Sequence, residues 1–151
     1  MLRDEINAAL KAAMKARDQT RVDALRLVNS AIQSAEIEVS RQGKAALTDA
    51  EVLAILQKLI RQRQEAAEMY EKGGRAELAA RERAESEIIS AYLPKPMSDL
   101  EAGAAIAALV REINAQGMKD MGRVMAALKE RFAGRLDFAK ASAKVKELLK
   151  S

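Results

Sequence analysis

The sequence contains no cysteine and no histidine among its 151 residues. Without cysteine, disulfides, thiolate metal sites and a cysteine nucleophile are excluded. Without histidine, the chain lacks the commonest general base near neutral pH and the commonest zinc ligand. The sequence also has neither a glycine-rich phosphate loop nor a recognisable pair of nucleophile and base. We therefore predict no catalytic residues, no metal site and no cofactor.

Aromatic residues and long apolar runs are equally scarce. Aromatic side chains make up 3% of the chain and tryptophan is absent, so Leu, Ile, Val, Ala and Met must form the core. This composition favours packed helices over sheets. No segment approaches the roughly 18 uncharged apolar residues needed to span a bilayer, and the charged N-terminus lacks the apolar centre of a signal peptide. The sequence predicts an all-α cytoplasmic protein with no membrane partner.

The two prolines, Pro94 and Pro96, mark a break in the helical pattern. Proline cannot continue a helix and disfavours helix in the residue before it. We predict an N-terminal helical domain at residues 1–93, a linker at residues 94–96, and a C-terminal three-helix domain at residues 97–151.

Apolar periodicity predicts four helices in the first domain, at about residues 3–17, 18–41, 48–70 and 75–92. Asp18 is expected to cap the second helix, and Thr48 with Glu51 forms a capping box for the third. The apolar faces of the first and fourth helices are expected to include Met14 and Leu78. These patterns predict an arrangement like a four-helix bundle.

Three helices are predicted in the second domain. Ser98 and Glu101 form a capping box for a helix that carries Leu100 on its apolar face and ends near Gly117. A helix at about residues 118–132 follows, and Asp137 is expected to cap the last one. The middle helix has an apolar stripe of methionines beginning at residue 118. We interpret this stripe as core, although methionine-rich surfaces also serve as adaptable binding faces.

Three glutamates on the fourth helix, Glu82, Glu85 and Glu87, resemble a metal-binding cluster at first sight. Arg81 and Arg83 alternate with them. Alternating charges on a helix are typical of a solvated, neutralised surface. We therefore predict that these carboxylates do not form a metal site.

The net positive charge lies entirely in the last third of the chain. Residues 1–93 contain 15 Lys+Arg and 15 Asp+Glu, whereas residues 94–151 contain 11 and 7, which gives +4. Basic side chains on two helices and in the turn between them could follow one strand of a folded RNA. A solvated basic surface without a ligand is the alternative. The candidate nucleic-acid-binding residues are Lys119, Arg123, Gly134, Arg135, Lys140 and Lys144.

A family resemblance is carried by the same region. The segments GMKDMGRVM at 117–125 and GRLD at 134–137 resemble the signature of the GatB/YqeY domain. Earlier segments match in the same order: AAMKARD at 12–18, LRLV at 25–28, EKGGRAELA at 71–79 and YLP at 92–94. In this family a glycine and a lysine often follow the aspartate of the turn. Here Phe138 and Ala139 follow it, and Lys140 supplies the charge one position later.

The resemblance implies a freestanding, bacterial YqeY-like protein with a helical bundle and a three-helix tail. The same module forms the tail of the B subunit of glutamine-dependent aspartyl/glutamyl-tRNA amidotransferases, where it helps to hold tRNA while other domains perform the chemistry. We therefore expect a non-catalytic accessory protein that binds the tRNA backbone. One alternative is an adaptor that docks on an aminoacyl-tRNA synthetase or an amidotransferase. A third hypothesis is carbon–nitrogen ligase activity with glutamine as amido donor, within a complex.

Overall fold

The structure, a computed structural model, describes residues 1–44 and 46–150. Within these ranges the chain forms seven α-helices and one short 3-10 helix, with no strand. The all-α prediction is therefore confirmed. The chain divides into two compact units, Met1–Leu93 and Pro94–Ser151. We call them the N-terminal unit and the C-terminal unit and describe each by itself.

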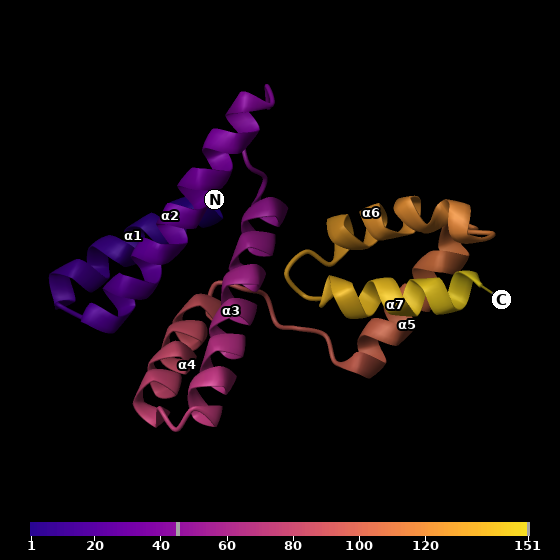
Figure 1. Cartoon of the computed structure of the whole chain (residues 1–151). Helices are drawn as coiled ribbons and strands as arrows, with labels where there is room; N and C mark the ends of the chain where they lie inside the picture. Colours follow the sequence, from indigo (N-terminus) through magenta and orange to yellow (C-terminus); the bar gives the residue numbers. More distant parts are fainter. Residues whose placement is uncertain (45, 151) are drawn as a thin grey trace. The chain divides into compact units, whose positions relative to one another are not determined.

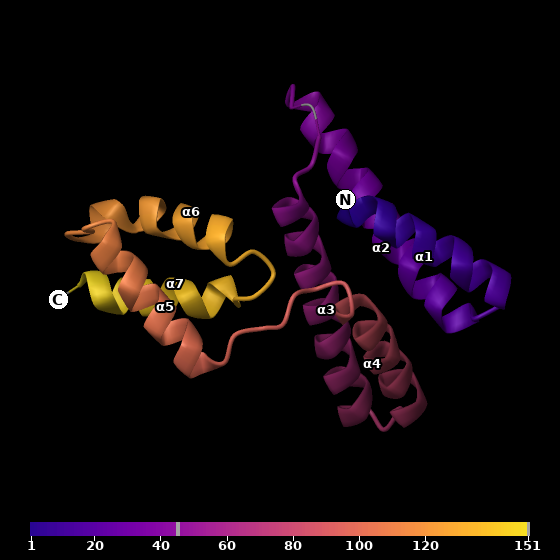
Figure 2. The same cartoon turned by 180° about the vertical axis from the view of Figure 1, so that it is seen from behind.

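The N-terminal unit consists of two helical hairpins. Helices α1 (Leu2–Ala16) and α2 (Gln19–Arg41) form the first hairpin, and α3 (Asp49–Lys72) and α4 (Ala76–Ser90) form the second. Both views show the two helices of each hairpin side by side (Figures 1 and 2). The bundle-like prediction is confirmed. The largest fully buried side chains of this unit are Ile6, Leu25, Val28, Ile32, Leu56 and Ile89.

The helix starts of the N-terminal unit follow the predicted caps. The Asp18 carboxylate accepts a hydrogen bond from the backbone N–H of Arg21 at 3.3 Å. Thr48 and Glu51 form the complete capping box, in which each side chain accepts from the other's backbone N–H at 3.1 Å. These bonds satisfy amides that have no partner within the helix.

The C-terminal unit has three α-helices around its own core. These are α5 (Asp99–Glu112), α6 (Met121–Arg131) and α7 (Phe138–Leu149), and the 3-10 helix η1 (Met118–Asp120) precedes α6. The three-helix prediction is confirmed. Helices α6 and α7 form an antiparallel hairpin joined by residues 132–137 (Figures 1 and 2). Its core consists of Ile106, Leu109, Val124, Leu128, Leu136, Ala141, Val145 and Leu149.

Four apolar side chains that were expected in the cores are exposed. Their exposed fractions are 49% for Met14, 36% for Leu78, 86% for Leu100 and 46% for Met118. In α1 the small side chain of Ala13 is buried instead of its neighbour Met14. Leu100 lies in the first turn of α5, ahead of the buried residues Ile106 and Leu109. At these four positions, which lie in the first or last turn of their helices, the burial predicted from helical spacing was wrong.

Two boundaries in the C-terminal unit differ from the sequence-based prediction. Helix α5 ends at Glu112, five residues before Gly117, because Asn114 adopts a left-handed conformation with φ 54°. Asparagine tolerates this conformation better than most residues. The predicted helix at 118–132 is divided into η1 and α6. None of the helices in the described ranges is both long and apolar enough to cross a membrane.

Candidate nucleic-acid interface

Lys119 and Arg123 lie on the outside of the C-terminal unit at the beginning of α6. Lys119 belongs to η1, and both side chains are exposed. The Arg123 guanidinium pairs with Asp120, with Nη2 and Oδ1 3.4 Å apart. The other Asp120 oxygen accepts the Gln116 N–H at 2.8 Å. This hydrogen bond is the main reason why the pKa of Asp120 is lowered, and the charges of Arg123 and Lys119 act in the same direction.

Gly134 and Arg135 lie in the turn between α6 and α7. Gly134 is buried and has φ 77°, a left-handed conformation that glycine adopts without a steric penalty. Its backbone therefore shapes the turn and is not part of the open surface. Arg135 is half-buried, and its Nε donates a hydrogen bond to the main-chain carbonyl of Lys95 at 3.0 Å.

Lys95 is a candidate that sequence reasoning missed. Its main-chain carbonyl accepts the hydrogen bond from the Arg135 side chain. A second hydrogen bond, from the Met97 N–H to the Arg135 carbonyl at 3.0 Å, holds the same segment. The Lys95 side chain itself is exposed. Both cations act on Glu101, whose pKa is lowered first by the Ser98 N–H, then by the Ser98 hydroxyl, and further by Arg135 and Lys95. The sequence showed only a lysine between two prolines, which we assigned to a linker.

Lys140 and Lys144 are exposed on α7, one turn apart. Lys140 lies in the first turn, where Asp137 caps the helix by accepting from the Ala139 N–H at 3.0 Å and the Lys140 N–H at 3.4 Å. The predicted Asp137 cap is therefore confirmed. The Lys144 Nζ lies 3.9 Å from the Glu147 carboxylate, so its charge is partly offset by a neighbour on the same helix.

The candidate residues form two groups and not one patch. Helices α6 and α7 run in opposite directions, so the start of α6 and the turn at 132–137 lie at opposite ends of the hairpin (Figure 1). By their places in the chain, Lys119 and Arg123 lie at the first end, Arg135 and Lys140 lie at the second, and Lys144 lies one turn further along α7. Helix α6 has 11 residues, so the two ends are separated by about 16 Å at 1.5 Å per residue. We call Lys119 and Arg123 the far-end cations, and Lys95, Arg135 and Lys140 the turn-end cations.

Among the remaining cations of the C-terminal unit, Arg131 has a structural contact. Its two Nη atoms bind both carboxylate oxygens of Glu112 at 2.6 and 2.7 Å. This bidentate pair links the end of α6 to the end of α5 and lowers the pKa of Glu112, chiefly through the hydrogen bonds. Arg131 is therefore already committed to a protein carboxylate.

Two of the three glutamates of α4, Glu82 and Glu85, belong to an ion-pair network. The Arg63 Nε lies 3.6 Å from Glu85 and 3.9 Å from Glu82, and Arg81 contacts Glu85 at 3.7 Å and Asp23 at 3.5 Å. Within the described ranges, no three acidic side chains are placed so that they could hold a metal ion. Glu85 acts here as a structural partner of two arginines.

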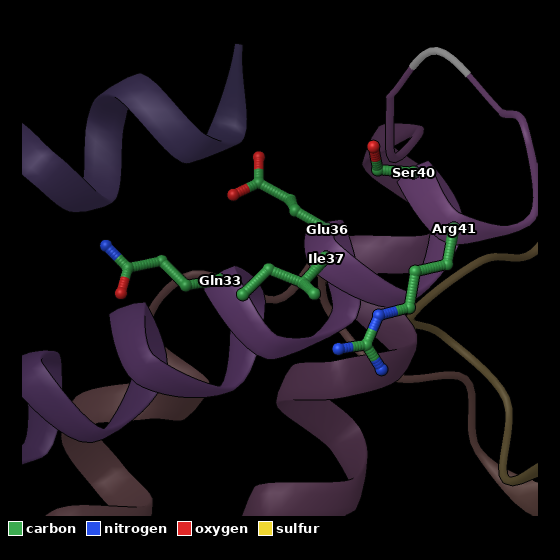
Figure 3. A pocket seen from close by; sticks show the side chains of 5 residues that line it. All are labelled: Gln33, Glu36, Ile37, Ser40 and Arg41. Carbon is green, nitrogen blue, oxygen red and sulfur yellow. The ribbon is translucent and has the colours of Figure 1, made fainter.

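A shallow hollow lies on the last turns of α2 in the N-terminal unit. Figure 3 shows its lining, in which the apolar side chain of Ile37 stands among polar neighbours. Ile37 is 57% exposed. The lining residues are Gln33, Glu36, Ile37, Ser40 and Arg41.

Comparison with known proteins places these features in a family. The sequence is 30% identical to an uncharacterised protein of Schizosaccharomyces pombe over 95 residues, which is 63% of this chain and 74% of the yeast protein. Residues 3–149 match the family described as Yqey-like protein. Since this match covers nearly the whole sequence, including both units and all the candidate residues, the chain belongs to the Yqey-like protein family.

Proposed function

We propose that this protein is a non-catalytic accessory protein that binds the phosphate backbone of tRNA through its C-terminal unit. The observation that carries the proposal is the placement of the charge. The net charge of +4 lies wholly in residues 94–151. Lys119, Arg135 and Lys140 have no carboxylate within 4 Å in the described part of the chain.

The two groups of cations suit an extended polyanion better than a small ligand. A separation of about 16 Å is too long for one small anion to contact both groups, whereas several phosphates of one polyanion can contact them together. Such contacts hold a backbone in place without reading its sequence. The relation of the family to the tail of the tRNA amidotransferase B subunit makes tRNA the preferred polyanion.

The test is a fluorescence-anisotropy titration of the full chain with bulk tRNA at low and at physiological salt. We expect affinity to fall log-linearly with salt concentration. The variant Lys119→Gln/Arg123→Gln/Arg135→Gln should bind more weakly, with a salt slope reduced by about 2–3, or about one per lost phosphate contact.

The matched control is Lys11→Gln/Lys58→Gln/Lys72→Gln. It removes three positive charges from exposed positions of the N-terminal unit. This control should bind tRNA with nearly unchanged affinity and slope. Equal losses of tRNA affinity in the two triple variants would show that only net charge matters. Unchanged affinity in Lys119→Gln/Arg123→Gln/Arg135→Gln would refute the proposed interface.

A second candidate function is an adaptor that docks on an aminoacyl-tRNA synthetase or an amidotransferase. The observation in its favour is the exposed Ile37 in the hollow on α2. Capture of a synthetase or amidotransferase after nuclease treatment, and its loss in Ile37→Ser, would support the adaptor. Recovery of RNA alone would count against it.

A further inference from the structure

We propose that Lys95 and Arg135 together form a binding site for one phosphate group of the RNA backbone. This inference rests on the proposed function and adds to it a residue outside the family signature quoted above. It also assigns a different task to each member of the pair. Arg135 presents a guanidinium held by a hydrogen bond, and Lys95 adds an exposed charged side chain from the residue that supplies the acceptor.

The guanidinium of Arg135 is oriented by a neutral partner. Its Nε donates to the Lys95 carbonyl at 3.0 Å. By contrast, Arg123 and Arg131 each pair with a carboxylate, which offsets their charge. A carbonyl fixes the direction of the side chain and, being neutral, does not form an ion pair with it. Arg135 thus keeps both Nη groups, the fork that binds two phosphate oxygens at once.

The position of Arg135 is fixed from both its main chain and its side chain. Its carbonyl accepts the Met97 N–H at 3.0 Å, and its N–H donates to the Phe132 carbonyl at 2.9 Å. Two hydrogen bonds therefore join Arg135 to the segment at 95–97. Its side chain donates to the Lys95 carbonyl, its carbonyl accepts the Met97 N–H, and these two partners flank Pro96. A cation that is held in this way loses little conformational entropy when an anion binds.

Glu101 is an acidic group whose pKa both cations help to lower, and its side chain is bound at the start of its own helix. One of its oxygens accepts the Ser98 N–H at 3.2 Å as part of the capping box of α5. Within the described ranges, neither Lys95 nor Arg135 has a carboxylate within 4 Å. Neither cation is therefore paired with Glu101, which stays bound to the N–H of Ser98 at the start of α5.

The test compares three versions of the full chain in the tRNA titration: wild type, Lys95→Gln and Lys72→Gln. Both substitutions remove one exposed lysine charge, one from each unit. We expect Lys95→Gln to weaken binding about five- to tenfold at low salt and to reduce the salt slope by about one. Lys72→Gln should change neither quantity appreciably.

A fourth variant, Arg135→Lys, keeps the charge but removes the guanidinium fork and its bond to Lys95. It should bind tRNA more weakly than wild type, and circular dichroism will show whether its helices are intact. If the wild-type protein binds tRNA and Lys95→Gln and Lys72→Gln have the same affinity and salt slope, this inference is overturned and the proposed function stands. Absence of any wild-type binding would overturn both.

Discussion

The N-terminal and C-terminal units use their arginines in different ways. In the N-terminal unit, four arginines each contact a carboxylate on another helix. Arg3 pairs with Glu36, Arg63 with Glu82 and Glu85, Arg81 with Asp23, and Arg83 with Glu71. These pairs link the helices of a unit whose basic and acidic residues are equal in number. In the C-terminal unit, the Arg131–Glu112 pair links two helices, and the other ion pairs of its described residues are local.

The contrast teaches that an arginine-rich helix is not by itself evidence for nucleic-acid binding. The N-terminal unit contains more cations than the C-terminal unit, but they are matched by acids and placed against them. The informative feature is a cation whose position is fixed while its charge remains unpaired. Arg135 meets this description, whereas Arg63, between two glutamates, does not.

The largest expected effect comes from truncating the core of one unit at a time. Leu128 and Leu56 are both fully buried, and a change to alanine costs about 2–5 kcal/mol. At about 0.05–0.15 kcal/mol per residue, the 58 residues of the C-terminal unit have only about 3–9 kcal/mol of stability. Leu128→Ala should therefore unfold this unit partly at 37 °C, as measured by circular dichroism, and abolish tRNA binding.

Leu56→Ala is the matched change in the N-terminal unit. It should lower the melting temperature and leave tRNA affinity nearly unchanged below the transition. Leu100→Ala, at a position 86% exposed, should alter neither property. If Leu56→Ala also abolished binding while its helices remained folded, the division of labour between the units would be wrong.

A smaller effect is expected from breaking the ion-pair network of the N-terminal unit. Glu85→Gln removes a carboxylate shared by Arg63 and Arg81. The Arg63 side chain is only 18% exposed, so its charge loses much of its compensation, and we expect unfolding to become easier by about 1–2 kcal/mol. Urea denaturation measures this. The control is Glu87→Gln, at an exposed position on the same helix. Equal losses of unfolding free energy in the two variants would show that net charge matters and pairing does not.

The reverse experiment releases a cation in the C-terminal unit. Glu147→Gln removes the partner of Lys144, which lies 3.9 Å away on an exposed face. Exposed pairs contribute little to folding, so the free energy of unfolding should hardly change. Binding of tRNA should tighten a few-fold and become more salt-dependent. Glu130→Gln adds the same charge change at an exposed position of α6 and should have a smaller effect.

The smallest effect concerns acid stability at the two capping boxes. The pKa values of Glu51 and Glu101 are both lowered from 4.5, mainly by the N–H groups of Thr48 and Ser98. A lowered folded-state pKa stabilises the fold fully above the unfolded value, and this contribution disappears as pH falls through the folded value. Glu51→Gln and Glu101→Gln should therefore each lose less stability than wild type as the pH falls below 4.5.

Lys95→Gln sharpens this comparison between the boxes. Because Lys95 helps to lower the pKa of Glu101 and does not act on Glu51, the variant should raise the Glu101 pKa and leave that of Glu51 unchanged. Carboxyl carbon chemical shifts in an NMR titration report both groups in one sample. A parallel shift of both would show that the charge acts over a long range and not through proximity.

The sequence predicted most of the fold because its signals are local. Capping boxes and N-caps need only residues three positions apart, and all four predicted starts, at Asp18, Thr48, Ser98 and Asp137, are capped as expected. Core positions were predicted where a helix is covered along its length. Met118 was misplaced because periodicity does not reveal that the helix begins with a 3-10 turn.

The candidate interface was predicted in composition but not in arrangement. The sequence indicated which residues carry the excess charge, and α6 and α7 present them at two ends. The contact of Arg135 with Lys95 joins residues 40 positions apart, and no spacing rule connects them. Similarly, Gly134 could be recognised as a turn residue, but its burial depends on the packing of the whole C-terminal unit.

The acceptor of the Arg135 side chain is a main-chain carbonyl, which every amino acid at position 95 would supply. Pro94 and Pro96 restrict the backbone on both sides of that carbonyl, whatever the intervening side chain. The charge at position 95 can therefore be changed without removing the acceptor that orients Arg135. The fold holds the guanidinium through the backbone, and the side chain of residue 95 is left for contacts outside the protein.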